Sequence, residues 1–231
     1  RHIPLGYYHP DGPIGQVFAA LGTETRFNHI GLIGLGAGTL AAYGRAGQEM
    51  TFHEIDAADV AIAENPDLFT YVRDSKAVIR MVVGDGRLTL ARVPDGAYGL
   101  IVLDAFSSDA IPVHLVTLEA LELYLSKLAP GGLLAFHISN RFLDLEPVLA
   151  RLGAALHLVV VGQIESFDPA TTTAMFQQQG RSASCWVLMA RNLSDLGPLA
   201  RDSRWPRSEP KADTPLWTDD YSNILSVFRW K

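Results

Sequence analysis

Cysteine is almost absent from this sequence, and so are the features that mark several classes of protein. The 231 residues include one cysteine, Cys185, which excludes an intramolecular disulfide and a zinc site built from several cysteines. No apolar stretch reaches the length of a membrane span, and no charged and then apolar leader opens the chain. We therefore expect a water-soluble protein of a reducing compartment, the cytoplasm.

Positive charge is also scarce. Lysine and arginine number 19 against 25 aspartates and glutamates, a formal net charge of −6. This balance lacks the excess of positive charge that binding to nucleic acid or to an anionic membrane surface requires, and it suits a small cationic partner. The seven histidines show no HExxH or other metal-ligand spacing, so no metal is expected. Ser107 and Ser108 lack the G-x-S-x-G pattern, which disfavours a hydrolase.

What the sequence does contain is a series of short apolar runs that alternate with helical patterns. The alternation predicts a doubly wound, mostly parallel α/β sheet. We predict seven strands, at residues 30–35, 50–56, 79–85, 98–104, 133–139, 158–164 and 184–191. The predicted helices cover residues 17–21, 39–43, 57–64, 67–73, 87–93, 117–128, 145–156 and 221–228, and a polar loop contains residues 177–179. We divide the chain into an N-terminal segment (1–28), a nucleoside-binding domain (29–192) and a C-terminal extension of that domain (193–231).

The stretch from residue 29 to residue 38, HIGLIGLGAG, is the first candidate for a ligand site. Its apolar run is followed directly by Gly34, Gly36 and Gly38, and then by a helical pattern. Glycines between a strand and a helix N-terminus suit the polar groups of a nucleotide. The alternative is a tight turn with no ligand, because a glycine triplet alone is a weak signal.

Acidic residues at the ends of the next predicted strands favour the ligand. They are Glu54, Asp56, Asp85 and Asp104. Parallel strands present their carboxyl ends at one edge of the sheet, where such folds bind ligands, so we expect one shared crevice. Glu54 follows Gly34 by about twenty residues, a spacing that suits a ribose diol. Asp56 and Asp85 can also be explained as helix caps.

Several segments of the sequence resemble the polyamine aminopropyltransferases, spermidine synthase and its relatives, which have the class I S-adenosylmethionine methyltransferase (Rossmann-like) fold. The resemblance spans roughly residues 8–140 and is closest to bacterial domains that form the soluble C-terminal half of a membrane-anchored chain. It rests on GPIGQ (12–16), IGLGAGTL (33–40), HEID (53–56), VVGDGR (82–87), VLDAFSSDAIP (102–112) and LAPGGLLAFHIS (128–139), with WTDDYSN (217–223) near the end.

The resemblance implies roles in donor binding. Gln16 would contact the nucleoside donor, decarboxylated S-adenosylmethionine, and Glu54 would hold its ribose hydroxyls, with Asp56 in the same crevice. Asp85 and Gly86 would address the adenine amine.

The resemblance also implies roles for the acids that face the amine. Asp104 would be the catalytic acid residue, and Asp109 a second carboxylate facing an amine acceptor. A carboxylate near both reactants can take the proton of the amine, and a second can hold a distant ammonium.

The sequence departs from the family in ways that keep other functions open. Ala37 stands where spermidine synthases carry an acid for the ammonium of the donor, and this favours S-adenosylmethionine and methyl transfer. Gly15 stands where the family has an aromatic residue before the glutamine. Tyr7, Tyr8 or Tyr221 would take the place of that aromatic side chain. The β-rich segment that builds the family's oligomer is largely missing, which leaves a homodimer as the assembly considered. A non-catalytic domain that senses a polyamine or nucleoside for an attached membrane domain is the third alternative.

Four further residues are ambiguous. His9 and His137 could transfer protons, but a histidine at a strand end is more often a structural, hydrogen-bonded group. Asp219 and Asp220 could add anionic contacts to an amine, or cap the predicted helix at 221–228.

Overall fold

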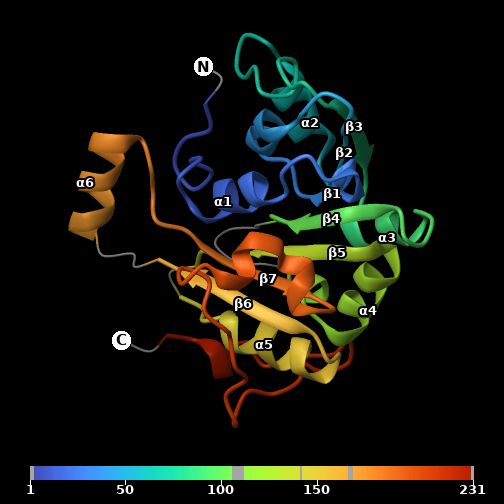
Figure 1. Ribbon diagram of the computed structural model, residues 1–231, viewed down its shortest axis with the longest axis vertical. Helices are drawn as coiled ribbons and strands as arrows, with labels where there is room; N and C mark the ends of the chain where they lie inside the picture. The colour runs from blue at the N-terminus through green and yellow to red at the C-terminus, as the bar shows by residue number, and fades with distance from the viewer. Residues whose placement is uncertain (1–2, 106–111, 141, 166–168, 230–231) are drawn as a thin grey trace.

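The fold is a seven-stranded sheet between two layers of helices (Figure 1). The computed structural model describes residues 3–105, 112–140, 142–165 and 169–229, with no side chains described at 169–172. The strands lie in the order β3-β2-β1-β4-β5-β7-β6. Their bounds are β1 (His29–Ile33), β2 (Glu49–Glu54), β3 (Val78–Val83), β4 (Tyr98–Leu103), β5 (Leu128–His137), β6 (Val159–Ile164) and β7 (Cys185–Ala190). The predicted fold class is confirmed.

The order of the strands places a ligand crevice at one point of the sheet. All neighbouring pairs are parallel except β5 with β7 and β6 with β7. The chain moves outward from β1 to β2 and β3, and then returns to place β4 on the other side of β1. Ligands of such folds bind at the carboxyl ends of the strands where the order reverses, here between β1 and β4.

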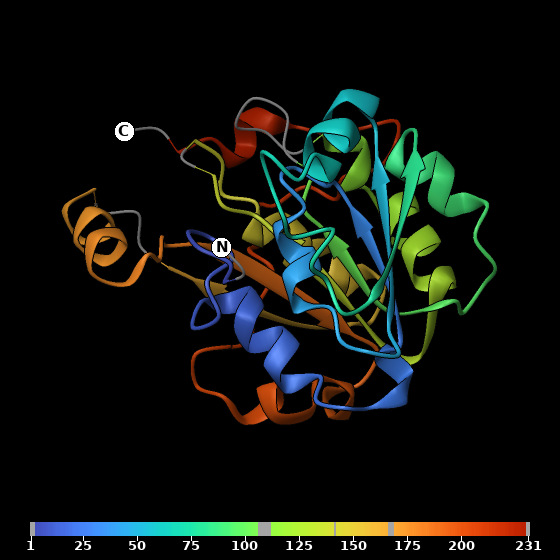
Figure 2. The same ribbon diagram turned by 90° about the horizontal axis from the view of Figure 1, so that it is seen from above.

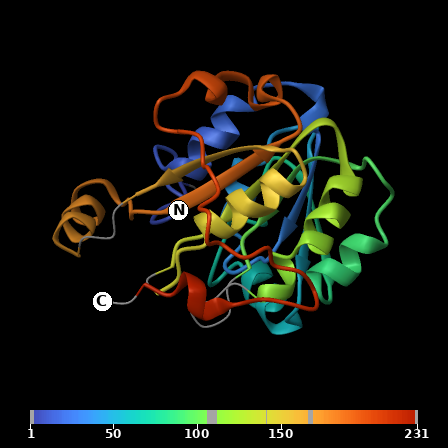
Figure 3. The same ribbon diagram turned by 90° about the horizontal axis from the view of Figure 1, so that it is seen from below.

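Successive side chains of the central strands pack alternately into two hydrophobic cores, one on each face of the sheet. In β4, Leu100 and Val102 pack on one face, whereas Ile101 and Leu103 pack on the other. One face is covered by α1 (Pro13–Ala20), α2 (Ala57–Glu64) and the 3₁₀ helices η2 (Thr39–Tyr43) and η4 (Leu193–Arg201). The other is covered by α3 (Gly86–Ala91), α4 (Leu118–Lys127) and α5 (Glu146–Ala155). Figures 2 and 3 show the two helical layers from opposite sides.

The helices differ from the prediction in several places. Residues 39–43 form a 3₁₀ helix, and residues 67–73 form turns. Asn65 ends α2, and its side chain accepts a hydrogen bond from the Asp67 N–H (2.9 Å) in the turn at 66–68. The helix predicted at 221–228 is only the 3₁₀ helix η5 (Ile224–Val227), and Val113–Leu115 forms the 3₁₀ helix η3. The predicted loop at 177–179 belongs to α6 (Pro169–Gln179), which stands off from the sheet in Figures 1 to 3. A further 3₁₀ helix, η1, covers Thr25–Phe27. Among the described residues, no helix has the length and apolar character needed to cross a bilayer.

Candidate active site

A cavity of about 420 Å³ opens where β1, β2 and β4 end. It gathers most of the residues that the sequence analysis placed in one crevice. The lining includes Tyr8, Gly34, Gly36, Glu54, Asp56, Asp85, Gly86 and Asp104, together with His53, Asp59, Pro112, His114 and Leu115. Gly38, Gln16, Asp219 and Asp220 are not among the residues that line it, and Asp109 lies outside the described residues.

The glycine turn brings the ends of β1 and β4 into contact. Gly34 has φ +97°, and a Cβ there would lie 2.4 Å from the carbonyl oxygen of Asp104. Only glycine allows this approach, because any side chain would overlap the neighbouring backbone. Gly36 also has a positive φ (+52°), but a Cβ there would meet nothing within 4 Å. The turn therefore closes the gap between the strands at Gly34 and leaves open space at Gly36.

Glu54 fixes the turn from the end of β2. Its side chain is buried, and its Oε2 accepts a hydrogen bond from the Leu35 N–H (2.8 Å). Its Oε1 accepts a second one from the Asp56 N–H (3.0 Å). Two backbone donors stabilise the buried charge, and a carboxylate with about four acceptor positions keeps others for a ligand.

Asp56 and Asp85 cap helices, as the alternative explanation for them predicted, and both also line the cavity. Asp56 accepts from the Ala58 N–H (2.8 Å) at the start of α2, and Asp85 accepts from the Leu88 N–H (2.9 Å) at the start of α3. The second oxygen of Asp85 lies 3.2 Å from His114 Nε2. The same two residues thus cap helices and line the cavity, because the helices begin where the strands end.

Asp104 is held by a histidine that the sequence analysis favoured as structural. Its Oδ1 lies 2.6 Å from His137 Nδ1, and the two side chains are 8% and 4% exposed. The ring of His137 stacks on Trp186 at 4.5 Å, and its Nε2 lies 2.7 Å from Ser139 Oγ. A nearly buried carboxylate therefore has a fixed imidazole partner, whose ring is clamped on two sides.

This pair could have been found from strand register. Leu103 of β4 is paired with Phe136 of β5, so the next residues, Asp104 and His137, are neighbours at the ends of parallel strands. Side chains at paired positions of parallel strands point to the same face. In the sequence, the pair is indicated by a polar residue at the corresponding position of two apolar runs that form neighbouring strands.

Two other ionisable side chains at the cavity have pKa values that their surroundings shift. Burial first, and then the charge and hydrogen bond of Asp104, raise the pKa of the Tyr8 hydroxyl. Burial lowers the pKa of His53 to about 4. His53 Nδ1 lies 2.9 Å from Thr89 Oγ1, and its Nε2 lies 3.3 Å from the Tyr98 hydroxyl. At neutral pH both Tyr8 and His53 are uncharged.

Gln16 lies outside the cavity because both ends of its amide are used within the fold. Its Nε2 donates to the Asp11 carbonyl (3.1 Å), and its Oε1 accepts from the Trp205 indole N–H (3.0 Å). The residue joins α1 to the C-terminal part of the chain. Its contact with the donor stays a prediction.

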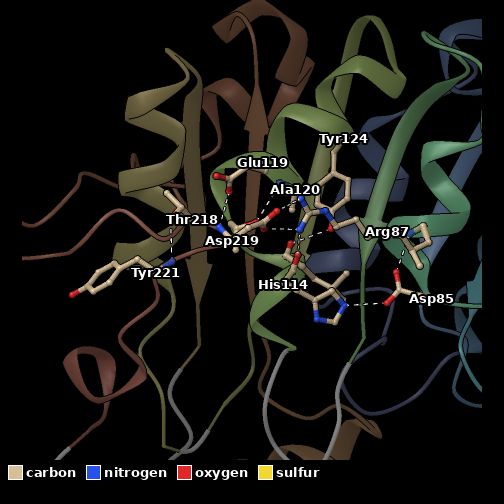
Figure 4. Close-up of polar contacts among 12 residues, drawn as sticks. Asp85, Arg87, His114, Glu119, Ala120, Tyr124, Thr218, Asp219 and Tyr221 are labelled. Atoms are coloured by element: carbon tan, nitrogen blue, oxygen red, sulfur yellow. Dashed lines mark hydrogen bonds and ion pairs between the residues drawn. The ribbon is translucent and has the colours of Figure 1, made fainter.

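Asp219 and Asp220 are also outside the cavity. Asp219 forms a two-pronged ion pair with Arg87, with both N–O distances at 2.6 Å (Figure 4). Asp220 is exposed. Neither caps a helix, because η5 begins at Ile224 and is capped by Asn223, whose side chain accepts from the Ser226 N–H (3.2 Å). Tyr221 is exposed as well, whereas Tyr7 and Tyr8 lie beside the His137 ring, at 5.9 and 6.1 Å.

The lining is strongly acidic. It carries the carboxylates Glu54, Asp56, Asp59, Asp85 and Asp104, and no lysine or arginine is among its described residues. Within the described part of the chain, no cluster of three or more histidine, cysteine or acidic side chains could hold a metal ion. Such a lining favours a cation over an anion of similar size.

No family model and no curated protein sequence matches the chain. Its structure is similar to a probable spermidine synthase from Corynebacterium glutamicum (TM-score 0.54, 21% identity, 76% of this chain and 60% of that one). It is also similar to the spermidine synthase of Thermotoga maritima (TM-score 0.56, 14% identity, 93% and 68%). An O-methyltransferase from Bacillus cereus, solved with SAH, gives a TM-score of 0.52 at 13% identity, over 78% and 81%. The chain thus spans 60% of the Corynebacterium protein. These likenesses confirm a spermidine synthase-like, class I methyltransferase-like fold.

Proposed function

We propose that this chain is a transferase that binds an adenosylsulfonium compound in the strand-end cavity and moves an aminopropyl-like group to a small amine. The observation that carries the proposal is Asp104, a nearly buried carboxylate that lines an acidic cavity and is fixed by His137. The fold shared with spermidine synthases and with a methyltransferase supports the same class of donor.

The acids along the cavity suggest how the nucleoside would be held. Glu54 has acceptor positions left for the ribose hydroxyls, and Asp85 with Gly86 lies where α3 begins, suited to the adenine amine. Pro112 and Leu115 supply apolar surface for the base. These roles follow the resemblance of HEID and VVGDGR to the aminopropyltransferases.

The proposed reaction is a substitution at the carbon attached to the sulfonium. The lone pair of a neutral amine forms the new C–N bond, and the electrons of the breaking C–S bond remain on sulfur, which leaves as a neutral thioether. The nitrogen then carries an extra proton, which passes to the Asp104 carboxylate. The Nδ1–H of His137 would hold that carboxylate in place, so that it meets the amine in a fixed orientation.

The charge of the lining supports decarboxylated S-adenosylmethionine as the donor. That compound carries a sulfonium and an ammonium and no carboxylate, and the described lining has five carboxylates and no lysine or arginine. One residue favours a second candidate, an S-adenosylmethionine-dependent methyltransferase. Ala37 in the glycine turn offers no anion for the ammonium of the decarboxylated compound.

Titration calorimetry with decarboxylated S-adenosylmethionine, S-adenosylmethionine and methylthioadenosine separates these functions. Preference for the decarboxylated donor, with aminopropylated amine found by mass spectrometry, is the expected result. Preference for S-adenosylmethionine with methylated product would establish the second candidate. Binding without any product would indicate a sensing domain, and absence of heat with all three compounds would refute nucleoside binding.

A further inference from the structure

One wall of the cavity depends on side chains far away in the sequence. Pro112, His114 and Leu115 form this wall, and the last two belong to the three-residue 3₁₀ helix η3. Within η3 itself, the Leu115 N–H donates to the Pro112 carbonyl (2.9 Å) and the Val116 N–H to the Val113 carbonyl (2.9 Å). So short a helix has little stability of its own, so its position must be set by its neighbours.

Two side chains hold this wall from outside. The Arg87 guanidinium donates to the His114 carbonyl (3.1 Å), and the buried Tyr124 hydroxyl donates to the Leu115 carbonyl (3.1 Å). Within the wall, the His114 ring contacts Asp85, another residue of the lining (Figure 4). Arg87 differs from Tyr124 because its own position is not fixed by a core: it lies in the first turn of α3.

Asp219 fixes Arg87. The two N–O distances of 2.6 Å make a paired, charge-assisted contact of the kind that sets the direction of a guanidinium. Asp219 is itself held, since its Oδ1 accepts from the Thr117 hydroxyl (2.8 Å) and its N–H donates to Glu119 Oε2 (2.9 Å). Hydrogen bonding to Arg87 lowers the pKa of Asp219, so the pair is charged at neutral pH.

The C-terminal extension (193–231), called the C-terminal segment below, positions Asp219 beside Arg87. Trp217, two residues earlier, is 1% exposed in the core under α4, and its carbonyl accepts from the Leu118 N–H (2.9 Å). The ion pair, by contrast, is reachable by water, with side-chain exposures of 20% for Arg87 and 41% for Asp219. The anchor is thus buried in the core, whereas the pair beyond it is in contact with solvent.

We propose that Arg87 and Asp219 form a latch, two positioning residues through which the C-terminal segment sets the η3 wall of the nucleoside cavity. The proposal rests on the proposed function insofar as a nucleoside is the ligand. By linkage, a ligand that contacts the η3 wall must close the latch as much as the closed latch favours the ligand. Asp219 then acts on ligand affinity without touching the ligand.

The test compares Asp219→Asn with Asp213→Asn, the same change at an exposed site in the same segment. Titration with methylthioadenosine should give a dissociation constant raised roughly threefold to tenfold for Asp219→Asn, the range of a partly exposed pair, and an unchanged one for Asp213→Asn. The KM for the donor should rise by the same factor while kcat stays constant. Equal dissociation constants for Asp219→Asn and wild type would overturn the latch, and so would equal losses in the two variants.

Two more variants separate positioning from a general loss of structure. Asp219→Glu keeps the charge and should recover part of the affinity. Arg87→Gln, Asp219→Asn and the double variant should share one dissociation constant, because either change opens the latch; additive losses would refute it.

Hydrogen exchange tests the latch even if no nucleoside binds. The amides of Leu115 and Val116, which close η3, should exchange faster in Asp219→Asn than in Asp213→Asn or wild type. Wild type that binds no nucleoside would refute the proposed function while leaving this comparison intact. Equal exchange in all three proteins would refute the latch alone.

Discussion

The two walls of the cavity are built in different ways. One consists of the ends of β1, β2 and β4, where Glu54 and Asp104 are nearly buried and are held by backbone amides and by His137. The other is η3, held from outside by Tyr124 and by the Arg87–Asp219 pair. The first is fixed by the sheet, whereas the second is fixed by side chains that the chain brings together over a separation of 132 residues.

The comparison teaches that the partner of a carboxylate decides what it can do. Asp104 was predicted to act on an amine, and Asp219 either to contact one or to cap a helix. Asp104 meets an imidazole at the cavity, whereas the charge of Asp219 is matched by a guanidinium outside it. A carboxylate paired with arginine has its charge matched within the fold, and the two-pronged contact fixes the direction of the guanidinium.

The largest effect is expected from Asp104→Asn in the strand wall. The amide keeps the shape but does not accept a proton from the amine, so turnover should fall by about 10²- to 10⁴-fold. Formation of methylthioadenosine measures it. Nucleoside affinity in the same variant should stay near that of wild type, and turnover that survives the change would rule out Asp104 as the proton acceptor.

The glycine turn tests whether the strand wall is rigid. Gly34→Ala should lower the free energy of unfolding by roughly 3 kcal/mol, because its Cβ would overlap the Asp104 carbonyl and its φ is +97°. Gly36→Ala, with open space around it, is the matched control and should cost about 1 kcal/mol. Urea denaturation gives both values. Equal costs would mean that the two strand ends can separate.

His53 predicts the pH dependence of the same wall. Its pKa falls from 6.5 to about 4 on folding, so the unfolded chain binds the proton more readily. Stability should therefore decrease as the pH falls from 6.5 to 4, by up to about 3 kcal/mol, and change no further through this group below that range. Urea denaturation at pH 7 and pH 4.5 measures the loss. His53→Asn should flatten the dependence, and an unaltered dependence would assign the loss to other groups.

A smaller effect is expected from His137, which contacts Asp104 and is not among the described residues that line the cavity. His137→Leu removes the donor to Asp104 and should lower kcat by about tenfold to a hundredfold, with the KM for the donor little changed. His137→Asn keeps a donor near the place of Nδ1 and should recover part of the rate. A rise in KM with constant kcat would instead assign His137 to binding.

Much of the strand wall could be predicted from the sequence. The apolar runs located β1, β2, β3 and β4, and the acids after them lie at one edge because parallel strands share their carboxyl ends. α2 was predicted at its observed bounds, since Asp56 supplies a cap in front of a helical pattern. These features depend on neighbours in the chain, which the sequence displays directly.

Other features required the tertiary structure. The polar segment at 177–179 gave no local sign of α6, and the short 3₁₀ helix η5 is capped by Asn223 and not by the two aspartates before it. The amide oxygen of Gln16 accepts from the indole of Trp205, 189 residues away, and no local pattern indicates that partner. A side chain's partner depends on which segments the fold brings together.

The sequence by itself determined the type of sheet and the row of acids at its edge, because hydrophobic period and strand ends are local properties. The tertiary structure decided which acid is paired with which base. Register placed His137 beside Asp104, and the anchor at Trp217 carried Asp219 to Arg87. Both of these pairs join segments far apart in the sequence, so they form only once the packing of the core has fixed the positions of the segments.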